Sequence, residues 1–132
     1  MAQVSDEQRV REGIDAWNRG DWEKAIGMIS PDVEWRIAQP LFDMPQLSYG
    51  HEGVIAFWRK WSEIWEHIHV DLEDMVPYDG GIAAYVRWRA RGRDGVEVDQ
   101  PVIFAFRIED GLTTGFTGYW DRDEAVQALG LA

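Results

Sequence analysis

The hydrophobic pattern of the chain changes its period once, at about His67. Before that point apolar residues recur every three or four positions, the spacing that places them on one face of a helix. After it they alternate with polar residues, as in half-buried strands. Helices followed by a run of strands are typical of an α+β domain, in which the helices cover one face of an antiparallel sheet. The 132 residues suffice for a single domain over 1–132.

Three helices are predicted in the first half of the chain. Their expected bounds are about residues 5–20, 21–30 and 52–66, and the first two open with the capping residues Ser5 and Asp21. The alternating stretch DVEWRI predicts a strand between the second and third helices. The segment after it, AQPLFDMPQLSYG, has two prolines and no period, so we expect a long loop there.

Four strands follow, separated by the turn sequences DGG, RDG and EDG. If RDG and EDG are three-residue loops with glycine in the left-handed conformation, the register of both hairpins is fixed. Trp88 then lies opposite Gln100 in the first hairpin, and Phe104 lies opposite Phe116 in the second. One sheet face becomes apolar and the other sets arginines opposite acids. A short capped helix, DRDEAVQALG, is expected after the last strand.

Composition and charge exclude several classes of partner. A net charge of −11 argues against nucleic acids, because phosphate backbones are bound by clustered Lys and Arg. No apolar run approaches the roughly 18 residues of a membrane span, and the polar, acidic start is unlike a secretory signal, so we expect a cytoplasmic protein. The absence of cysteine excludes thiolate metal sites, and no cofactor is expected. A small, neutral, apolar molecule fits better as a partner.

Eight tryptophans are the most unusual feature of the composition. Burying one such ring stabilises a fold by about 2–3 kcal/mol, and we assign this structural role to Trp22 and Trp65. The other rings converge on the apolar sheet face, and we predict that they line a ligand cavity, in which Gly118 leaves space. The predicted ligand-binding residues are Trp17, Trp35, Tyr49, Trp58, Trp61, Trp88, Gln100, Phe104, Phe116, Gly118 and Trp120.

The stretch HIHVD contains a possible metal-binding trio, His67, His69 and Asp71. The apolar residues between them must face the core, so the trio points outward. The predicted register then places Arg87 opposite Asp71, and a cation there repels a metal ion. We therefore predict no metal site.

A few polar residues are candidates for contact with a ligand. Gln100 is the one polar residue that the register places on the apolar face, and an unpaired buried amide costs about 1–3 kcal/mol. It bonds either to Trp120 or nearby backbone, or to a ligand. Asp43 and His51, in or just after the long loop, are the candidate catalytic residues for proton transfer. Their alternatives are an exposed loop carboxylate and a histidine that merely begins a helix.

Three stretches resemble a known family: AWNRGDWEKAIGMISPDVEW, GHEGVIAFWRKW and YWDRDEAVQALGL. In this order they are similar to the SnoaL-like branch of the nuclear transport factor 2-like superfamily. The resemblance implies a cone in which three N-terminal helices pack on a curved antiparallel sheet, with a short C-terminal helix and a pocket between the layers. Members include steroid isomerases, epoxide hydrolases, polyketide cyclases and binding domains, so the fold does not settle the function.

The resemblance also implies that the best-understood catalytic groups are missing. A tyrosine and two aspartates catalyse the reaction of the ketosteroid isomerases, and the matching positions here are Gly13, Trp35 and Phe104. The limonene-epoxide-hydrolase branch has an aspartate at the position of Gly118. Both chemistries lose their central residues in this chain.

Three hypotheses follow. The chain either binds a small, neutral, mostly apolar or aromatic ligand without catalysis, or is a divergent cyclase-, isomerase- or epoxide hydrolase-like enzyme that uses Asp43 or His51. An aspartate that reaches the cavity would favour the enzyme, and one that faces solvent would favour binding. The third hypothesis is a dimerisation module with a closed core. In each case we expect a homodimer formed through the outer sheet face, as in many members of the family.

Overall fold

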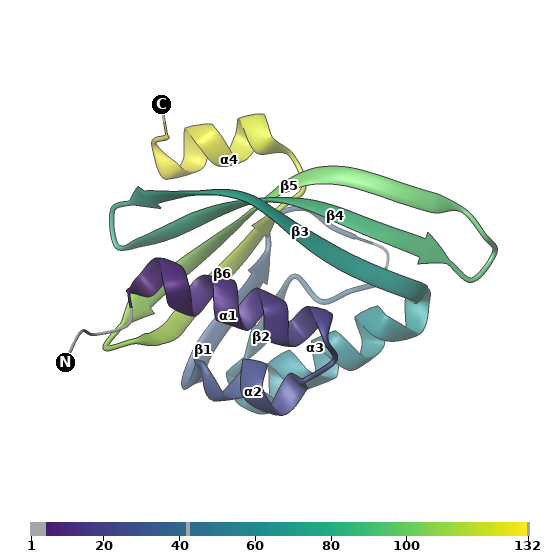
Figure 1. Cartoon of the computed structure of the whole chain (residues 1–132), viewed down its shortest axis with the longest axis horizontal. Helices are drawn as coiled ribbons and strands as arrows, with labels where there is room; N and C mark the ends of the chain where they lie inside the picture. The colour runs from purple at the N-terminus through teal and green to yellow at the C-terminus, as the bar shows by residue number, and fades with distance from the viewer. Residues whose placement is uncertain (1–4, 42, 132) are drawn as a thin grey trace.

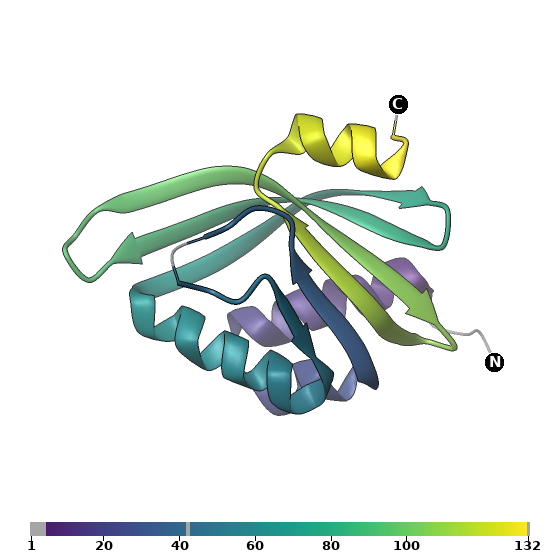
Figure 2. The same cartoon turned by 180° about the vertical axis from the view of Figure 1, so that it is seen from behind.

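A curved six-stranded sheet carries three helices on its concave side and a fourth on its convex side (Figures 1 and 2). The computed structural model describes residues 5–41 and 43–131. The helices are α1 (Asp6–Asn18), α2 (Trp22–Gly27), α3 (Gly50–Ile64) and α4 (Arg122–Leu129). The strands are β1 (Ile29–Ile37), β2 (Leu47–Tyr49), β3 (Trp65–Tyr78), β4 (Gly81–Gly92), β5 (Glu97–Glu109) and β6 (Leu112–Tyr119). The predicted α+β fold is confirmed.

The helix ends follow the capping signals of the sequence. The side chains of Ser5, Asp21 and Asp121 each accept a backbone N–H from the first turn of α1, α2 and α4. At the other end of α4, Gly130 has a φ of 68°, the left-handed conformation that glycine adopts without strain. No helix in the described part of the chain is long and apolar enough to span a membrane.

Several element bounds differ from the prediction because distant pairing overrides the local pattern. α2 ends at Gly27, earlier than predicted, since Ile29 already pairs with β6. The predicted loop contains β2, in which Ser48 pairs with Trp35 of β1. α3 ends at Ile64, because the next residue already pairs with β4. Helical spacing therefore identified the helices but not where the sheet interrupts them.

The predicted register of the β4–β5 hairpin is confirmed. The register predicted for the β5–β6 hairpin was wrong by two residues. Trp88 lies opposite Gln100, and the loop between β4 and β5 ends at Gly95 with a φ of 91°. In the next hairpin Phe104 lies opposite Gly118, not opposite Phe116. The set of residues that faces inward is nevertheless the predicted one.

A turn and a bulge together explain this shift. Asp110 and Gly111 form a two-residue loop with φ values of 51° and 80°, as in a type I′ turn. Alone, this shorter loop would exchange the two faces of the hairpin. Arg107 pairs with Gly115 and Ile108 pairs with Thr113, so Thr114 is an extra residue in β6, and this bulge restores the alternation.

The sheet is completed by β1, which runs parallel to β6, while the four-strand meander β3–β6 is antiparallel. This parallel pairing sets Trp35 beside Phe116 on the concave side. At the opposite edge the side chain of Asn18 pairs with the backbone of Val70 in β3. Its Nδ2 donates to the Val70 carbonyl oxygen (2.8 Å), and its Oδ1 accepts the Val70 N–H (2.9 Å). The end of α1 is thereby fixed to the edge strand.

The convex side of the sheet is partly covered by α4 (Figure 1). Ala125 of this helix packs on Ala83 and Ile103 of the sheet. Arg122, the first residue of α4, donates to the Glu73 carboxylate (2.6 Å) and to the Val86 carbonyl oxygen (2.8 Å). Ion pairs cover another part of this face, as the sequence predicted. The homodimer expected on the same face remains a prediction.

Replacing Arg122 with alanine should lower the free energy of unfolding by about 1–3 kcal/mol, because charge-assisted hydrogen bonds across the sheet are lost. Urea unfolding would measure the change. The control is Arg89→Ala, since the side chain of Arg89 is 56% exposed and forms surface ion pairs, which contribute about 0–1 kcal/mol. Equal losses in the two variants would show that Arg122 does not anchor α4.

Stability should also depend on the ionisation of Glu73. The hydrogen bond from Arg122 holds the pKa of Glu73 below its ordinary value of 4.5. A carboxylate with a lowered folded-state pKa stabilises the fold above its unfolded pKa, and this contribution disappears as pH falls through the folded value. The stability difference between the natural protein and Glu73→Gln should therefore shrink as the pH falls below the ordinary pKa of 4.5. Urea unfolding at each pH tests this, and a constant difference would contradict it.

Candidate functional site

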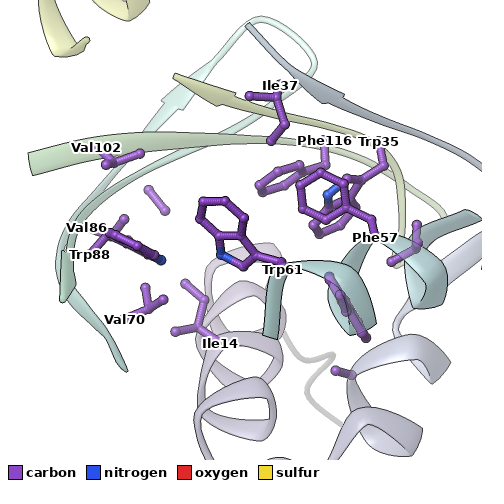
Figure 3. Packing of buried hydrophobic residues seen from close by; sticks show 14 of the residues in the cluster. Ile14, Trp35, Ile37, Phe57, Trp61, Val70, Val86, Trp88, Val102 and Phe116 are labelled. Atoms are coloured by element: carbon purple, nitrogen blue, oxygen red, sulfur yellow. The ribbon is translucent and has the colours of Figure 1, made fainter. Parts of the chain in front are cut away.

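An apolar cavity of about 130 Å³ lies between the concave sheet face and helices α1–α3 (Figure 3). The core is therefore not completely filled. Its wall consists mostly of aromatic and aliphatic side chains. The described residues of the wall are Arg9, Val10, Gly13, Ile14, Trp17, Ala25, Met28, Ile29, Trp35, Ile37, Leu41, Phe57, Trp58, Trp61, Val70, Trp88, Phe104, Phe106, Thr113, Phe116 and Trp120.

Most of the predicted ligand-binding residues belong to this wall. Those that do are Trp17, Trp35, Trp58, Trp61, Trp88, Phe104, Phe116 and Trp120. Trp22 and Trp65, which we assigned to the core, are not part of the wall but pack behind it, against Trp58 and Trp88 respectively. The inward-facing set of rings could thus be predicted from spacing and strand register. Its role in binding remains a prediction.

Trp61 is the centre of the larger group of rings (Figure 3). It projects from α3 toward the sheet, and its ring centroid lies 5.4 Å from that of Trp88 and 6.2 Å from that of Trp120. Within the helix layer it also contacts Phe57 at 6.3 Å. On its other side it meets Trp65 edge-on at 5.7 Å. The contacts with Trp88 and Trp120 are tilted, that with Trp65 is edge-to-face and that with Phe57 is stacked. Offset-stacked and edge-to-face arrangements are geometries that aromatic pairs favour.

A second group of rings surrounds Trp35 on β1. Its indole stacks on Phe116 with centroids 3.8 Å apart and planes inclined by 13°. Trp58 meets it edge-on at 5.8 Å, and Phe57 lies at 6.4 Å. The Nε1 atom of Trp35 is buried and has no hydrogen-bond acceptor among the described residues, and the same is true of Nε1 in Trp120. Two indole donors of the cavity wall are therefore unsatisfied by the protein.

The structure places three predicted ligand-binding residues elsewhere. Tyr49 is 61% exposed and lies outside the cavity. Gly118 is buried, but an added Cβ would lie only 3.3 Å from Cδ1 of Ile37, so a neighbouring side chain already occupies its space. Gln100 donates from Nε2 to the carbonyl oxygen of Trp120 (3.0 Å). This is the backbone alternative that we considered for its amide.

Neither proton-transfer candidate reaches the cavity. Asp43 is exposed beside a separate surface hollow that Tyr49 also lines, and its carbonyl oxygen accepts from Nζ of Lys60 (2.7 Å). His51 lies at the start of α3, with Nε2 at 2.7 Å from the carbonyl oxygen of Ile29. Only a protonated ring nitrogen can donate to that oxygen. His51 therefore joins α3 to β1 and does not contact the cavity.

Two members of the HIHVD trio, His69 and Asp71, also form contacts within the protein. Asp71 lies opposite Arg87, as predicted, and its Oδ2 is 3.1 Å from Nε of Arg89. Its Oδ1 lies 3.0 Å from Nε2 of His69. Among the described residues no three His, Asp or Glu side chains are placed to hold a metal ion.

The three positions that the resemblance assigns to the catalytic residues of ketosteroid isomerases lie at the cavity. Gly13, Trp35 and Phe104 all belong to its wall. In the described part of the wall no side chain is an aspartate, glutamate or histidine. The guanidinium of Arg9 has hydrogen-bond donors but no acceptor, and it donates to the Gly111 carbonyl oxygen (3.1 Å). The described part of this wall therefore has no carboxylate or imidazole that could accept a proton.

Sequence reasoning missed several residues of the wall. Val10 and Ile14 lie on the same helical stripe as Trp17, so the spacing in α1 could have identified them. Met28 and Thr113 lie near the ends of their elements, and no pattern singles them out. Their place in the wall follows from the pairing of β1 with β6, which brings both ends together.

The sequence and the structure were compared with those of known proteins. Residues 10–116 match the family model described as a SnoaL-like domain. No curated protein matches the sequence.

Solved structures of the nuclear transport factor 2-like (NTF2-like) fold superpose on the chain. An NTF2-like protein of unknown function from Burkholderia pseudomallei has a TM-score of 0.83 at 21% identity, covering 96% of this chain and 98% of that one. TerC, co-crystallised with polyporic acid, has a TM-score of 0.82 at 14% identity, with 94% and 96% covered. RV0760c from Mycobacterium tuberculosis, in complex with estradiol-17beta-hemisuccinate, has 0.77 at 20% identity, with 92% and 97% covered. At these identities the likeness establishes the fold alone.

Replacing Trp61 with leucine should lower the free energy of unfolding by about 2–4 kcal/mol, because its ring contacts are lost and the cavity grows. The control is Trp22→Leu, since Trp22 is only half-buried and lies outside the cavity wall. Its loss should be about half as large. Urea unfolding would measure both, and an equal or larger loss in the control would contradict the central role of Trp61.

Proposed function

The chain belongs to the SnoaL-like domain family, and we propose that it binds a small, neutral, mostly apolar or aromatic molecule in the cavity without catalysis. The observation that carries this proposal is the composition of the wall, which is formed by rings and aliphatic groups. A wall of this kind, with few polar groups, is typical of a small-molecule site. In its described part, no carboxylate or imidazole is available for acid–base chemistry.

The size of the cavity limits the ligand to about one ring. At about 130 Å³ it is close to engineered cavities of about 150 Å³ that bind benzene. Pockets for drug-sized compounds are usually about 300–1,000 Å³. A larger polycyclic ligand would require the surrounding rings to move.

The charge of the protein favours a neutral ligand. The net charge of −11 disfavours anions in general. A cation could use the faces of the indole rings, but Arg9 lies in the wall and repels positive charge. A neutral molecule meets neither penalty.

The divergent-enzyme alternative is not supported by the positions of Asp43 and His51. A general acid or base must lie within about 3 Å of the proton that it moves, directly or through one water. Asp43 is exposed on the surface, and His51 is bonded to the backbone at the start of β1. Because Asp43 faces solvent and not the cavity, its position favours binding over catalysis.

Similar structures agree with a binding role for this fold. TerC was crystallised with polyporic acid, and RV0760c was determined in complex with estradiol-17beta-hemisuccinate. Each of these structures was obtained with a small organic compound. We carry over to this chain the binding of a small molecule, and not the identity of either compound.

Toluene should bind with a Kd on the order of 0.1 mM, equivalent to about −5.5 kcal/mol, and the substitution Gly13→Leu should weaken binding at least about tenfold. Gly13 lines the cavity, and a Cβ added there meets Sδ of Met28 at an ordinary 3.8 Å. Gly13→Ala is therefore the matched control, which should retain binding and be about 0.5–1 kcal/mol more stable. Titration calorimetry and tryptophan fluorescence would measure binding.

Three outcomes would contradict parts of the proposal. A steroid that binds as tightly as toluene would contradict the size limit. Tetramethylammonium binding as tightly as toluene would contradict the preference for a neutral ligand. If no compound gives saturable binding, the proposed function is wrong and the rings serve only to pack the core.

A further inference from the structure

The polar side chains in the described part of the cavity wall are nearly all hydrogen-bond donors. Six tryptophans line the cavity together with Arg9, and both indole and guanidinium groups donate without accepting. Thr113 has the only hydroxyl group among the described side chains of the wall, and no amide or carboxylate side chain belongs to that part. A ligand in this cavity therefore meets donors rather than acceptors.

Two of these donors are unsatisfied by the protein. Trp35 is 8% exposed, and its Nε1 is buried with no acceptor among the described residues. Nε1 of Trp120 is in the same situation, although the ring as a whole is half-buried. Buried donors without acceptors are unfavourable and uncommon in folded proteins.

The surroundings of Trp35 disfavour a water molecule as its acceptor. A buried water makes about three hydrogen bonds. The rings packed around Trp35 belong to Phe57, Trp58 and Phe116, whose side chains carry no oxygen. An aromatic ligand with one acceptor oxygen needs only the hydrogen bond from the Trp35 indole. Its ring fills the apolar space around that oxygen.

We propose that the ligand is a neutral aromatic compound bearing a carbonyl acceptor, such as an aryl ketone or ester, and that the Trp35 indole N–H donates to its oxygen. The Trp120 N–H is a second donor to the same class of ligand. This inference rests on the proposed function and specifies its substrate class. A ligand whose polar group is only a donor would leave that group unsatisfied, because the wall offers few acceptors.

The backbone of Trp120 is held in a way that suits this role. Its N–H donates to Oε1 of Gln39 (3.0 Å), and its carbonyl oxygen accepts from Gln100 (3.0 Å). The ring is then seated against Trp88 at 4.9 Å. Two glutamine amides on the neighbouring segments thus fix the residue from both sides of its peptide unit.

A matched pair of ligands tests the proposal. Acetophenone and α-methylstyrene have the same shape, but a carbonyl oxygen in the first is a methylene group in the second. Titration calorimetry on the whole chain should show acetophenone binding at least as tightly, although it is the less hydrophobic of the two. Trp35→Phe should weaken acetophenone binding about 3- to 10-fold, the effect of one ordinary hydrogen bond. The same variant should change α-methylstyrene binding less than about twofold.

The control variant is Trp22→Phe, which lies outside the wall and should leave both affinities unchanged. An indole N–H spectrum of the natural protein gives an independent measurement should Trp35→Phe fail to fold. At least one indole N–H signal should move downfield with acetophenone and not with α-methylstyrene.

The outcomes separate this inference from the proposed function. If α-methylstyrene binds more tightly and no indole signal distinguishes the two ligands, the donor role is wrong while the cavity still binds apolar rings. If neither ligand binds, the proposed function itself is wrong, and this inference with it.

Discussion

The contact of Trp61 with the sheet sets the spacing between the helix layer and the strands. Its ring meets those of Trp88 and Trp120 at 5.4 and 6.2 Å, so α3 cannot approach the sheet more closely than these rigid rings allow. On the other side of the cavity the wall includes Gly13 and Ala25, which are too small to fill the space that this separation leaves. The cavity is thus a consequence of large and small residues facing each other across one gap.

The same sheet separates two electrostatic environments. On its convex face Arg87 and Asp99 form an ion pair at 2.9 Å, and Arg89 and Asp71 another at 3.1 Å. These pairs are exposed, so they contribute to solubility and register more than to stability. The concave face presents rings, and in the described wall the formal charge is that of Arg9. A strongly acidic chain can therefore keep a nearly neutral interior.

The sequence predicts which side of the sheet a residue faces. It predicts the residue's partner on the neighbouring strand only in part. Alternation and turn chemistry placed Trp88 opposite Gln100 correctly. The predicted register of the second hairpin was wrong by two residues because no local signal marks the bulge at Thr114 of β6, yet the bulge kept the inward set unchanged. The alternatives for Asp43 and His51 were left open for a different reason. They have no periodic pattern, and contacts with α3 and β1 decide their positions.

The packing around Trp35 disfavours an acid–base group at that position, and this supports the binding function that we propose. Trp35 occupies a position that the resemblance assigns to a catalytic aspartate, and its ring is stacked on Phe116 at 3.8 Å and covered edge-on by Trp58. An aspartate there would leave a void and place a charge among rings, at a cost of several kcal/mol. Gly13 and Phe104 depart from the pattern within the same wall. One substitution would therefore not restore acid–base chemistry, because the neighbouring rings are arranged around the residues that replaced it.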